Sequence, residues 1–269
     1  MNWEMRYTMD LSGKNVVLTG ANSGIGMEML KLLLCKGSRV LAADLRTDAV
    51  ESLADPNAVP FVCDISSKEG VDLLFEKAYE EFGTINVFIA NAGFAYYEII
   101  DYEDWDRIQR IFDTNTVSPI YSYQRFVRRL GEREGAFAIT CSGIGILGMP
   151  GYALYGSTKF ALNGFQESLR LEKPGNVRLT VLYPVAVNTD FFRSASETDF
   201  ERPYPVQEPG LVARRMIEGI EKNRKKVFPS RLFRLALILF TLIPPIKKAY
   251  WRSERKKLDR FLEKTGRKI

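Results

Sequence analysis

Residues 14–26, KNVVLTGANSGIG, join a short apolar run to a turn that contains three glycines. The apolar run is typical of a buried β-strand, and the helical spacing of apolar residues begins directly after the turn, at Ile25–Lys36. At such a junction Gly20 permits a tight turn, whereas Gly24 and Gly26 permit close approach of the backbone to a ligand. The amides at the start of the helix then face a pyrophosphate. Glycines alone also fit an ordinary β–α turn, but the strand before them and the helix after them favour nucleotide binding.

The alternation of strand and helix patterns continues from this turn to residue 228. Near-continuous apolar runs predict further strands at residues 38–43, 58–63, 85–90, 136–141, 177–183 and 225–228. Helical spacing predicts further helices at Lys68–Phe82, Tyr102–Leu130, Tyr152–Leu171 and Gly210–Lys222. The predicted fold class is therefore α/β, with a Rossmann-like, doubly wound, parallel seven-stranded sheet in a single domain. Pro184–Pro209 is the longest irregular stretch, and a loop of that length predicts a functional role for it.

The composition excludes several classes of enzyme. The 269 residues contain no histidine, which excludes Ser-His-Asp and Cys-His nucleophiles and histidine-ligated metal sites. Cys35, Cys63 and Cys141 are odd in number and far apart, so we expect neither a disulfide framework nor a metal site. Reduced cysteines, and the lack of an apolar leader in residues 1–14, predict a cytoplasmic protein.

The end of the chain differs in charge from the rest. Residues 231–269 contain 12 Lys and Arg but 3 Asp and Glu, whereas residues 1–230 contain 26 basic and 30 acidic side chains. We therefore expect a catalytic or binding domain at 1–230 and a basic, partly apolar helical tail at 231–269. The apolar run Leu235–Ile243 is followed by Pro244 and is too short to span a bilayer.

Three roles stay open for this tail. It could be a helix in a membrane interface, which would make the protein peripheral on a membrane, or a dimer contact, or a lid over a pocket. Nucleic acid is not an expected partner, because the basic residues are confined to the tail and no recognised nucleic-acid-binding module accompanies them.

An acidic residue ends the second predicted strand. Asp44 lies 24 residues after Gly20, where a carboxylate can accept hydrogen bonds from the adenosine ribose hydroxyls and repel a 2′-phosphate. This position favours NAD over NADP. Arg39 and Arg46 keep NADP open as the alternative, because an arginine near the ribose can pair with the phosphate. A carboxylate at this place can also serve only to cap a helix or a loop.

A tyrosine and a lysine lie one helical turn apart in GYALYGSTKFALNG (residues 151–164), as Tyr155 and Lys159. Tyrosine, with an ordinary pKa of about 10, is a poor base at neutral pH, and a lysine on the same helical face stabilises its phenolate. Tyr152 also lies on that side of the helix, but it lacks the one-turn spacing to the lysine, so we expect it to be a pocket wall or a buried aromatic. The pair alone is weak evidence, and other motifs at the strand ends strengthen it.

The order of these motifs resembles that of the short-chain dehydrogenase/reductase family, over roughly residues 12–228. The family's glycine pattern T-G-x-x-x-G-x-G is met by Thr19, Gly20, Gly24 and Gly26. Its N-A-G motif is met by Asn91, Ala92 and Gly93. Its catalytic tetrad is met by Asn115, Ser142, Tyr155 and Lys159. The family's usual Pro-Gly after the sixth strand is replaced by Pro184-Val185.

The resemblance implies a role for each residue of the tetrad. Tyr155 is the implied general acid/base, and Lys159 stabilises its phenolate and holds the nicotinamide ribose. Ser142 orients the substrate oxygen, and Asn115 holds a water that relays the proton.

The resemblance also implies a cofactor site in which Asp64 and Ile65 contact the adenine, and Val187 and Thr189 contact the nicotinamide. The full set of expected cofactor-binding residues is Gly20, Asn22, Ser23, Gly24, Ile25, Gly26, Asp44, Asp64, Ile65, Asn91, Ala92, Gly93, Tyr155, Lys159, Pro184, Val187 and Thr189. No metal is implied.

The expected function is an NAD(P)-dependent oxidoreductase, with NAD preferred, that interconverts an alcohol and its ketone or aldehyde. Apolar side chains in the loops after the strands predict a lipid-, sterol- or retinoid-like substrate, although half of them could instead pack in the core. These side chains are Phe94, Ile144, Leu147, Met149, Phe191 and Phe192. The alternative function is a dinucleotide-sensing protein of the same fold with little catalysis. The resemblance further implies a homodimer or homotetramer through the helices at Tyr102–Leu130 and Tyr152–Leu171.

Overall fold

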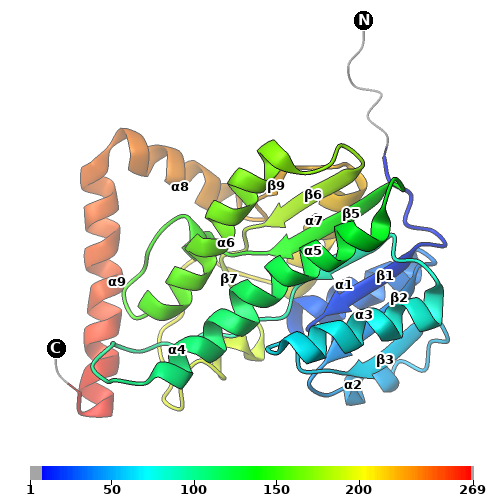
Figure 1. Ribbon diagram of the computed structural model, residues 1–269. Coiled ribbons are helices and arrows are strands. Elements are labelled where there is room, and N and C mark those ends of the chain that lie inside the picture. The colour runs from blue at the N-terminus through cyan, green and yellow to red at the C-terminus, as the bar shows by residue number, and fades with distance from the viewer. Residues whose placement is uncertain (1–7, 268–269) are drawn as a thin grey trace, which may run out of the picture.

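A parallel seven-stranded sheet forms the centre of the protein (Figure 1). The structure is a computed structural model and describes residues 8–267. The start of the predicted unit 1–230 and the last residues of the predicted unit 231–269 lie outside the described residues. The strands of this sheet are β3 (Ala58–Val62), β2 (Arg39–Asp44), β1 (Asn15–Thr19), β4 (Val87–Ala90), β5 (Gly135–Thr140), β6 (Val177–Leu182) and β9 (Lys226–Val227), in spatial order. The chain builds outward from β1 to β3 and then crosses to β4 and builds the other way. The predicted doubly wound fold is confirmed.

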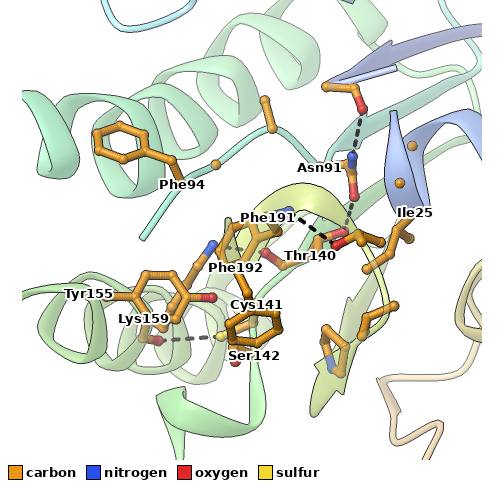
Figure 2. Close-up of a pocket in the computed structure, with 18 of the residues that line it drawn as sticks. Ile25, Asn91, Phe94, Thr140, Cys141, Ser142, Tyr155, Lys159, Phe191 and Phe192 are labelled. Carbon is orange, nitrogen blue, oxygen red and sulfur yellow. Dashed lines mark hydrogen bonds between the residues drawn. The ribbon is translucent and has the colours of Figure 1, made fainter. Parts of the chain in front are cut away.

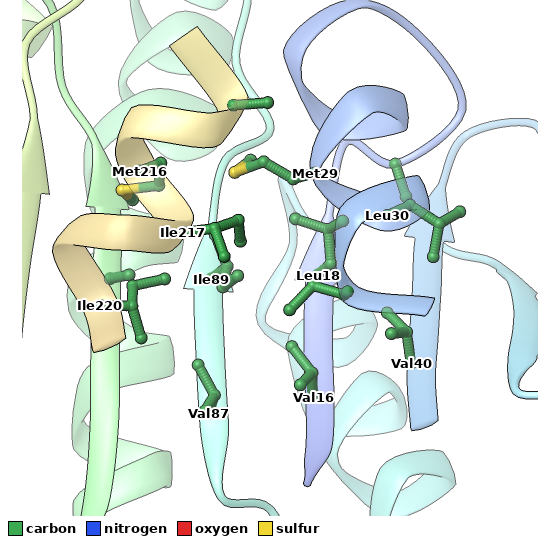
Figure 3. Close-up of a cluster of buried hydrophobic side chains, with 14 of the residues drawn as sticks. Val16, Leu18, Met29, Leu30, Val40, Val87, Ile89, Met216, Ile217 and Ile220 are labelled. Atoms are coloured by element: carbon green, nitrogen blue, oxygen red, sulfur yellow. The ribbon is translucent and has the colours of Figure 1, made fainter. Parts of the chain in front are cut away.

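Helices cover both faces of the sheet, because the side chains of each strand alternate between the two faces. Val16 and Leu18 of β1 pack with α1 (Gly24–Cys35) and α7 (Pro209–Glu221) on one face (Figure 3). Val17 lies in the cluster on the opposite face. The helices of that face are α3 (Lys68–Phe82), α5 (Ser118–Leu130) and α6 (Ala153–Glu172). A four-residue helix, α2 (Asp48–Glu51), was not predicted, because it is too short to show a period.

The prediction of one helix over Tyr102–Leu130 is wrong in its middle. The structure has α4 (Trp105–Phe112), a π-helical turn at Asp113–Val117, and then α5. Pro119 explains the change, because it has no N–H to donate to the carbonyl of Asn115 four residues earlier. The widened turn brings Asn115 to a fully buried position beside the cavity described below.

The loop predicted at Pro184–Pro209 contains regular structure. β7 (Ala186–Val187) and β8 (Val206–Gln207) pair in parallel as a separate two-stranded sheet, and Asp190–Phe192 form one 3₁₀ turn. Strands of two residues leave no periodic signal in the sequence. The pairing draws the two ends of the loop together at the carboxyl side of the main sheet.

The chain ends in two helices that leave the sheet and return along its side (Figure 1). α8 (Arg231–Leu242) follows β9, and Ser230 caps it by accepting a hydrogen bond from the backbone N–H of Phe233. α9 (Pro244–Thr265) then runs beside the body and buries Leu258, Phe261 and Leu262. Within residues 8–267, no helix is both long enough and apolar enough to cross a membrane.

Candidate active site

A cavity of about 670 Å³ runs along the carboxyl ends of the parallel strands. Its wall is formed by the segments that directly follow β1, β2, β3, β4, β5 and β6, together with the loop at residues 184–209 and the two C-terminal helices. Ligands bind at this edge in open α/β sheets. All but two of the predicted site residues line the cavity, and the exceptions are Asn22 and Asn115.

The glycine turn lies at one wall of the cavity and is close-packed. Gly20 and Gly24 have φ angles of +68° and +54°, which favour glycine. A Cβ on Gly26 would lie 1.7 Å from the carbonyl oxygen of Gly20, so no larger residue fits there. The turn therefore presents backbone rather than side chains to the cavity.

Asn91 connects the glycine turn to the centre of the site. Its side-chain amide donates hydrogen bonds to the carbonyl oxygens of Thr19 and Gly20, both at 3.1 Å. Its side-chain oxygen accepts a hydrogen bond from the hydroxyl of Thr140 at 3.0 Å (Figure 2). Thr140 was not predicted from the sequence, and its position at the end of β5, two residues before Ser142, was the available signal.

Asp44 is held at the opposite end of the cavity from the tyrosine. One carboxylate oxygen accepts the backbone N–H of Asn22 at 2.9 Å, and the other accepts that of Leu45 at 2.7 Å. The side chain of Asn22 points elsewhere, because its oxygen caps α2 by accepting the backbone N–H of Ala49 at 2.9 Å. A contact of Asn22 with a cofactor through its side chain therefore has no support in the geometry, and a backbone contact stays a prediction.

Arg39 and Arg46, which left NADP as the alternative cofactor, do not line the cavity. Arg39 begins β2, at the far end of the strand from Asp44, and its guanidinium stacks over the ring of Phe82 at 4.9 Å. Six residues of β-strand span about 16 Å, so Arg39 does not reach the ribose end of the site. Arg46 is exposed. Asp64 and Ile65 line the cavity after β3, and their contact with an adenine stays a prediction.

Ser142, Tyr155 and Lys159 come together on the wall formed by β5 and α6 (Figure 2). The ammonium of Lys159 lies 5.8 Å from the centre of the Tyr155 ring and donates a hydrogen bond to the carbonyl of Thr140 at 3.2 Å. A Cβ on Gly93 would lie 2.9 Å from the side-chain oxygen of Asn115, so the glycine of the N-A-G motif leaves room for that amide.

Burial disfavours the charged forms of these groups, so it lowers the pKa of a lysine and raises the pKa of a tyrosine or a cysteine. It lowers the pKa of Lys159 to about 8. It raises the pKa of Tyr155, whereas a hydrogen bond between Tyr155 and Ser142 acts in the opposite direction. It also raises the pKa of Cys141 to about 11, so this thiol is not a nucleophile at neutral pH. The raised pKa of Tyr155 disfavours its phenolate, so this tyrosine needs a positive charge beside it before it can act as a base near neutral pH.

Asn115 supports the site from behind the cavity wall. Its side-chain amide donates to the carbonyl of Phe94 at 2.8 Å and to the hydroxyl of Thr158 at 3.1 Å, and its oxygen accepts the backbone N–H of Phe94 at 3.0 Å. The side chain therefore fixes the N-A-G loop against α6. The predicted water relay through Asn115 stays a prediction.

Aromatic and aliphatic side chains line the same cavity as Tyr155. All six apolar residues predicted from the sequence line the cavity, and Phe191 lies 5.8 Å from the Tyr155 ring, centre to centre. Tyr152 is buried and also lines the cavity, in agreement with the expected pocket wall. The cavity is also lined by three aromatic residues that were not predicted from the sequence, Tyr204, Phe233 and Tyr250.

The cavity fits a dinucleotide at three points. The glycine turn offers bare backbone in its middle, Asp44 offers a carboxylate at one end, and Lys159 offers a cation at the other. Fold and site together define a dinucleotide-binding oxidoreductase of the doubly wound class.

Comparison with known proteins identifies the family. A family model described as short chain dehydrogenase matches residues 14–199. The chain therefore belongs to the short chain dehydrogenase family.

Two curated relatives cover most of the chain. It is 23% identical to 11-beta-hydroxysteroid dehydrogenase 1A of Arabidopsis thaliana, over 89% of this chain and 75% of that protein. It is 25% identical to epidermal retinol dehydrogenase 2 of Homo sapiens, over 87% of this chain and 80% of that protein.

Two solved structures share the fold. A short chain dehydrogenase/reductase from Burkholderia phymatum in complex with NAD has a TM-score of 0.77 and 21% identity, over 89% of this chain and 96% of that chain. A short chain dehydrogenase from Burkholderia cenocepacia in complex with NADP has a TM-score of 0.76 and 21% identity, over 90% of this chain and 98% of that chain.

Proposed function

We propose that the protein is an NAD-preferring oxidoreductase that interconverts an apolar alcohol and its ketone or aldehyde, with Tyr155 as general acid/base. The observation that carries this proposal is the meeting of Ser142, Tyr155 and Lys159 on one wall of a cavity that also contains the glycine turn. The pKa of Lys159, lowered to about 8 by burial, places its titration within reach of neutral pH.

The chain's own residues supply the proton chemistry. In the oxidative direction the phenolate of Tyr155 takes the proton of the substrate hydroxyl, and in the reductive direction its hydroxyl returns that proton to the carbonyl oxygen. Lys159 lowers the cost of the phenolate through its positive charge, and Ser142 holds the substrate oxygen beside Tyr155. When bound, the nicotinamide supplies the chemistry that accepts or donates the hydride.

An apolar substrate is supported by the wall around the hydroxyl of Tyr155. Four aromatic side chains line the cavity with Tyr155, and they are Phe191, Phe192, Phe233 and Tyr250. Burial of apolar substrate surface against these rings stabilises the complex by about 25 cal/mol per Å². The names of the two relatives, which refer to a hydroxysteroid and to retinol, fit a substrate of this kind.

A preference for NAD is supported by Asp44. Its carboxylate is fixed by two backbone amides at the ribose end of the cavity, where a 2′-phosphate would bring a second negative charge close to it. Solved relatives of similar fold have been seen with NAD and with NADP, so the choice depends on this chain's own residues.

Self-association as a homodimer or homotetramer is supported by apolar side chains on the outer helices. Trp105 and Ile108 of α4 and Phe160 and Leu171 of α6 are exposed by 40% or more, and burial between two copies would remove them from water. A single species at the mass of one chain in sedimentation would contradict this part of the proposal.

The catalytic role of Tyr155 is tested by Tyr155→Phe, which removes the hydroxyl and keeps the ring. We expect turnover of an apolar alcohol with NAD to fall by about 10²–10⁴-fold, with cofactor affinity little changed. The matched control is Tyr152→Phe, on the same helix and also in the wall, which should keep activity within severalfold. Full turnover in Tyr155→Phe would contradict the mechanism. If the wild-type protein binds NAD saturably but oxidises no alcohol, the alternative of a dinucleotide-sensing protein is favoured.

A further inference from the structure

Helix α8 exposes a continuous apolar stripe. Leu232, Leu235, Leu239 and Leu242 follow one another at spacings of three and four residues, so they lie on one face of the helix. Their exposed fractions are between 37% and 71%, and Ile238 beside them is 52% exposed. All twelve residues of α8 are described, and none of them is buried. Leucines in such a row are normally covered by another surface.

Positively charged residues lie at both ends of this stripe along the chain. Arg231 and Arg234 lie at its start, and Lys247, Lys248 and Arg252 follow the proline turn that joins α8 to α9. Residues 231–253 contain no aspartate or glutamate. An apolar face flanked only by cations matches acyl chains beneath anionic headgroups.

A second copy of the same chain fits this face less well. In a two-fold symmetric contact the same patch occurs on both partners, so the five cations of one copy would meet the five cations of the other. Like charges brought together at an interface are destabilising.

Helix α9 is held against the body at three places, and the proline turn joins it to α8. Phe261 of α9 packs on Tyr97, with ring centres 4.9 Å apart. Arg260 forms a two-bond ion pair with Glu201 at 2.8 and 2.9 Å. The indole N–H of Trp251 donates to the carbonyl of Gly148 at 2.9 Å, next to the loop that lines the cavity.

The same helix pair lines the substrate part of the cavity. Phe233 in the first turn of α8 lies against the backbone beside Ser142, since a Cβ on Gly143 would be 2.9 Å from its ring. Tyr250 of α9 also lines the cavity and stacks on Phe240 of α8, with ring centres 5.4 Å apart. Leu232 and Phe233 are adjacent in sequence, so the exposed stripe begins beside the cavity wall.

We propose that α8 lies in the interface of an anionic lipid bilayer, with Leu232, Leu235, Leu239 and Leu242 among the acyl chains, and that the apolar substrate enters the cavity from the lipid past Phe233 and Tyr250. The entry route rests on the proposed function, whereas the docking of α8 does not. The bilayer is bound at its surface, with the body of the protein outside it.

The docking is tested by co-sedimentation of the full chain with vesicles of phosphatidylcholine alone or mixed with phosphatidylglycerol. We expect binding to the mixed vesicles, and a loss of about tenfold or more in partition coefficient for Leu235→Glu, which puts a charge among the acyl chains. The matched control is Leu73→Glu on α3, because Leu73 and Leu235 are exposed by 55% and 54%. The control should bind like the wild type.

The charge contribution is measured with Lys247→Gln/Lys248→Gln. We expect this variant to lose most of the preference for phosphatidylglycerol while it keeps some binding through the leucines. Docking is overturned if the wild type binds neither vesicle, or if Leu235→Glu binds as well as the wild type. A change from dimer to monomer in Leu235→Glu, without lipid binding by the wild type, would instead identify the stripe as a contact between copies.

The entry route is tested by turnover of a long-chain alcohol supplied in mixed vesicles and of a short-chain alcohol supplied in water. We expect Leu235→Glu to lower kcat/KM for the vesicle alcohol by about tenfold, as its binding falls, and to leave the water-soluble alcohol unchanged. Equal kcat/KM values for both proteins with the vesicle alcohol would overturn the route. If the wild type oxidises neither alcohol, the proposed function and the route fail, and the sedimentation experiment still decides the docking.

Discussion

Helices α1 and α8 each have twelve residues and are both rich in apolar side chains, but α1 lies in the core and α8 lies at the surface. α1 buries Met29, Leu30 and Leu33 against the sheet and α7 (Figure 3), whereas α8 buries no residue along its described length. The difference shows that an apolar helix is covered only where the topology brings a partner to it.

The partner of α1 is fixed by the chain around it. The glycine turn allows α1 to start in contact with β1, and right-handed crossovers place α7 on the same face of the sheet. α8 instead begins after β9, the edge strand, where the sheet offers no further surface. We therefore read the first helix as core and the second as a contact surface.

The largest effect is expected for a pair of leucine truncations, one on each helix. Leu30→Ala on α1 removes a side chain with 0% exposure, and we expect it to lower the free energy of unfolding by about 2–5 kcal/mol. Leu235→Ala on α8, with 54% exposure, should change it by less than about 0.5 kcal/mol. Urea denaturation measures both. Equal losses would mean that α8 is part of the core.

A second test compares a buried lysine with an exposed one. Burial lowers the pKa of Lys159 to about 8, below its ordinary 10.5, so between these pH values the unfolded chain binds more protons than the folded one. The free energy of unfolding should therefore gain up to about 3 kcal/mol from this group as pH rises from 8 to 10.5.

Lys159→Met should lack this gain, and the exposed Lys248→Met should keep it. The relevant quantity is the difference between each variant and the wild type at every pH, because buried thiols and tyrosines titrate in the same range with the opposite sign. A constant difference between Lys159→Met and the wild type from pH 7 to 10.5 would show that the lysine is not desolvated.

The smallest expected effects are changes in KM and kcat/KM that differ between the two ends of the cavity. Asp44→Ala should raise KM for NAD and improve the use of NADP, changing the ratio of the two kcat/KM values by about tenfold, with KM for the alcohol unchanged. Phe233→Ala on α8 should raise KM for an apolar alcohol by about tenfold, with KM for NAD unchanged. Steady-state kinetics with both cofactors distinguishes them. A Phe233→Ala variant with unchanged alcohol KM would remove α8 from the substrate site.

Much of the site could be read from the sequence because its residues stand at strand ends. The motifs around Gly20, Asn91, Ser142 and Tyr155 each follow a strand or begin a helix, and a parallel sheet brings all such ends to one edge. Asn22 shows the limit of this reasoning, since its place in the glycine turn does not reveal that its side chain caps α2. The direction of a side chain in a turn depends on neighbours that are distant in sequence.

Local patterns were enough to predict the doubly wound sheet and the residues around the glycine turn and Tyr155, because strand period, helix period and glycine spacing can be read from neighbouring residues. The sequence also showed that the tail is basic and apolar. The folded structure was needed to show that Phe233 and Tyr250 line the cavity and that the leucines of α8 stay exposed. Packing between segments about a hundred residues apart depends on how the elements are arranged in space, and no local pattern records that arrangement.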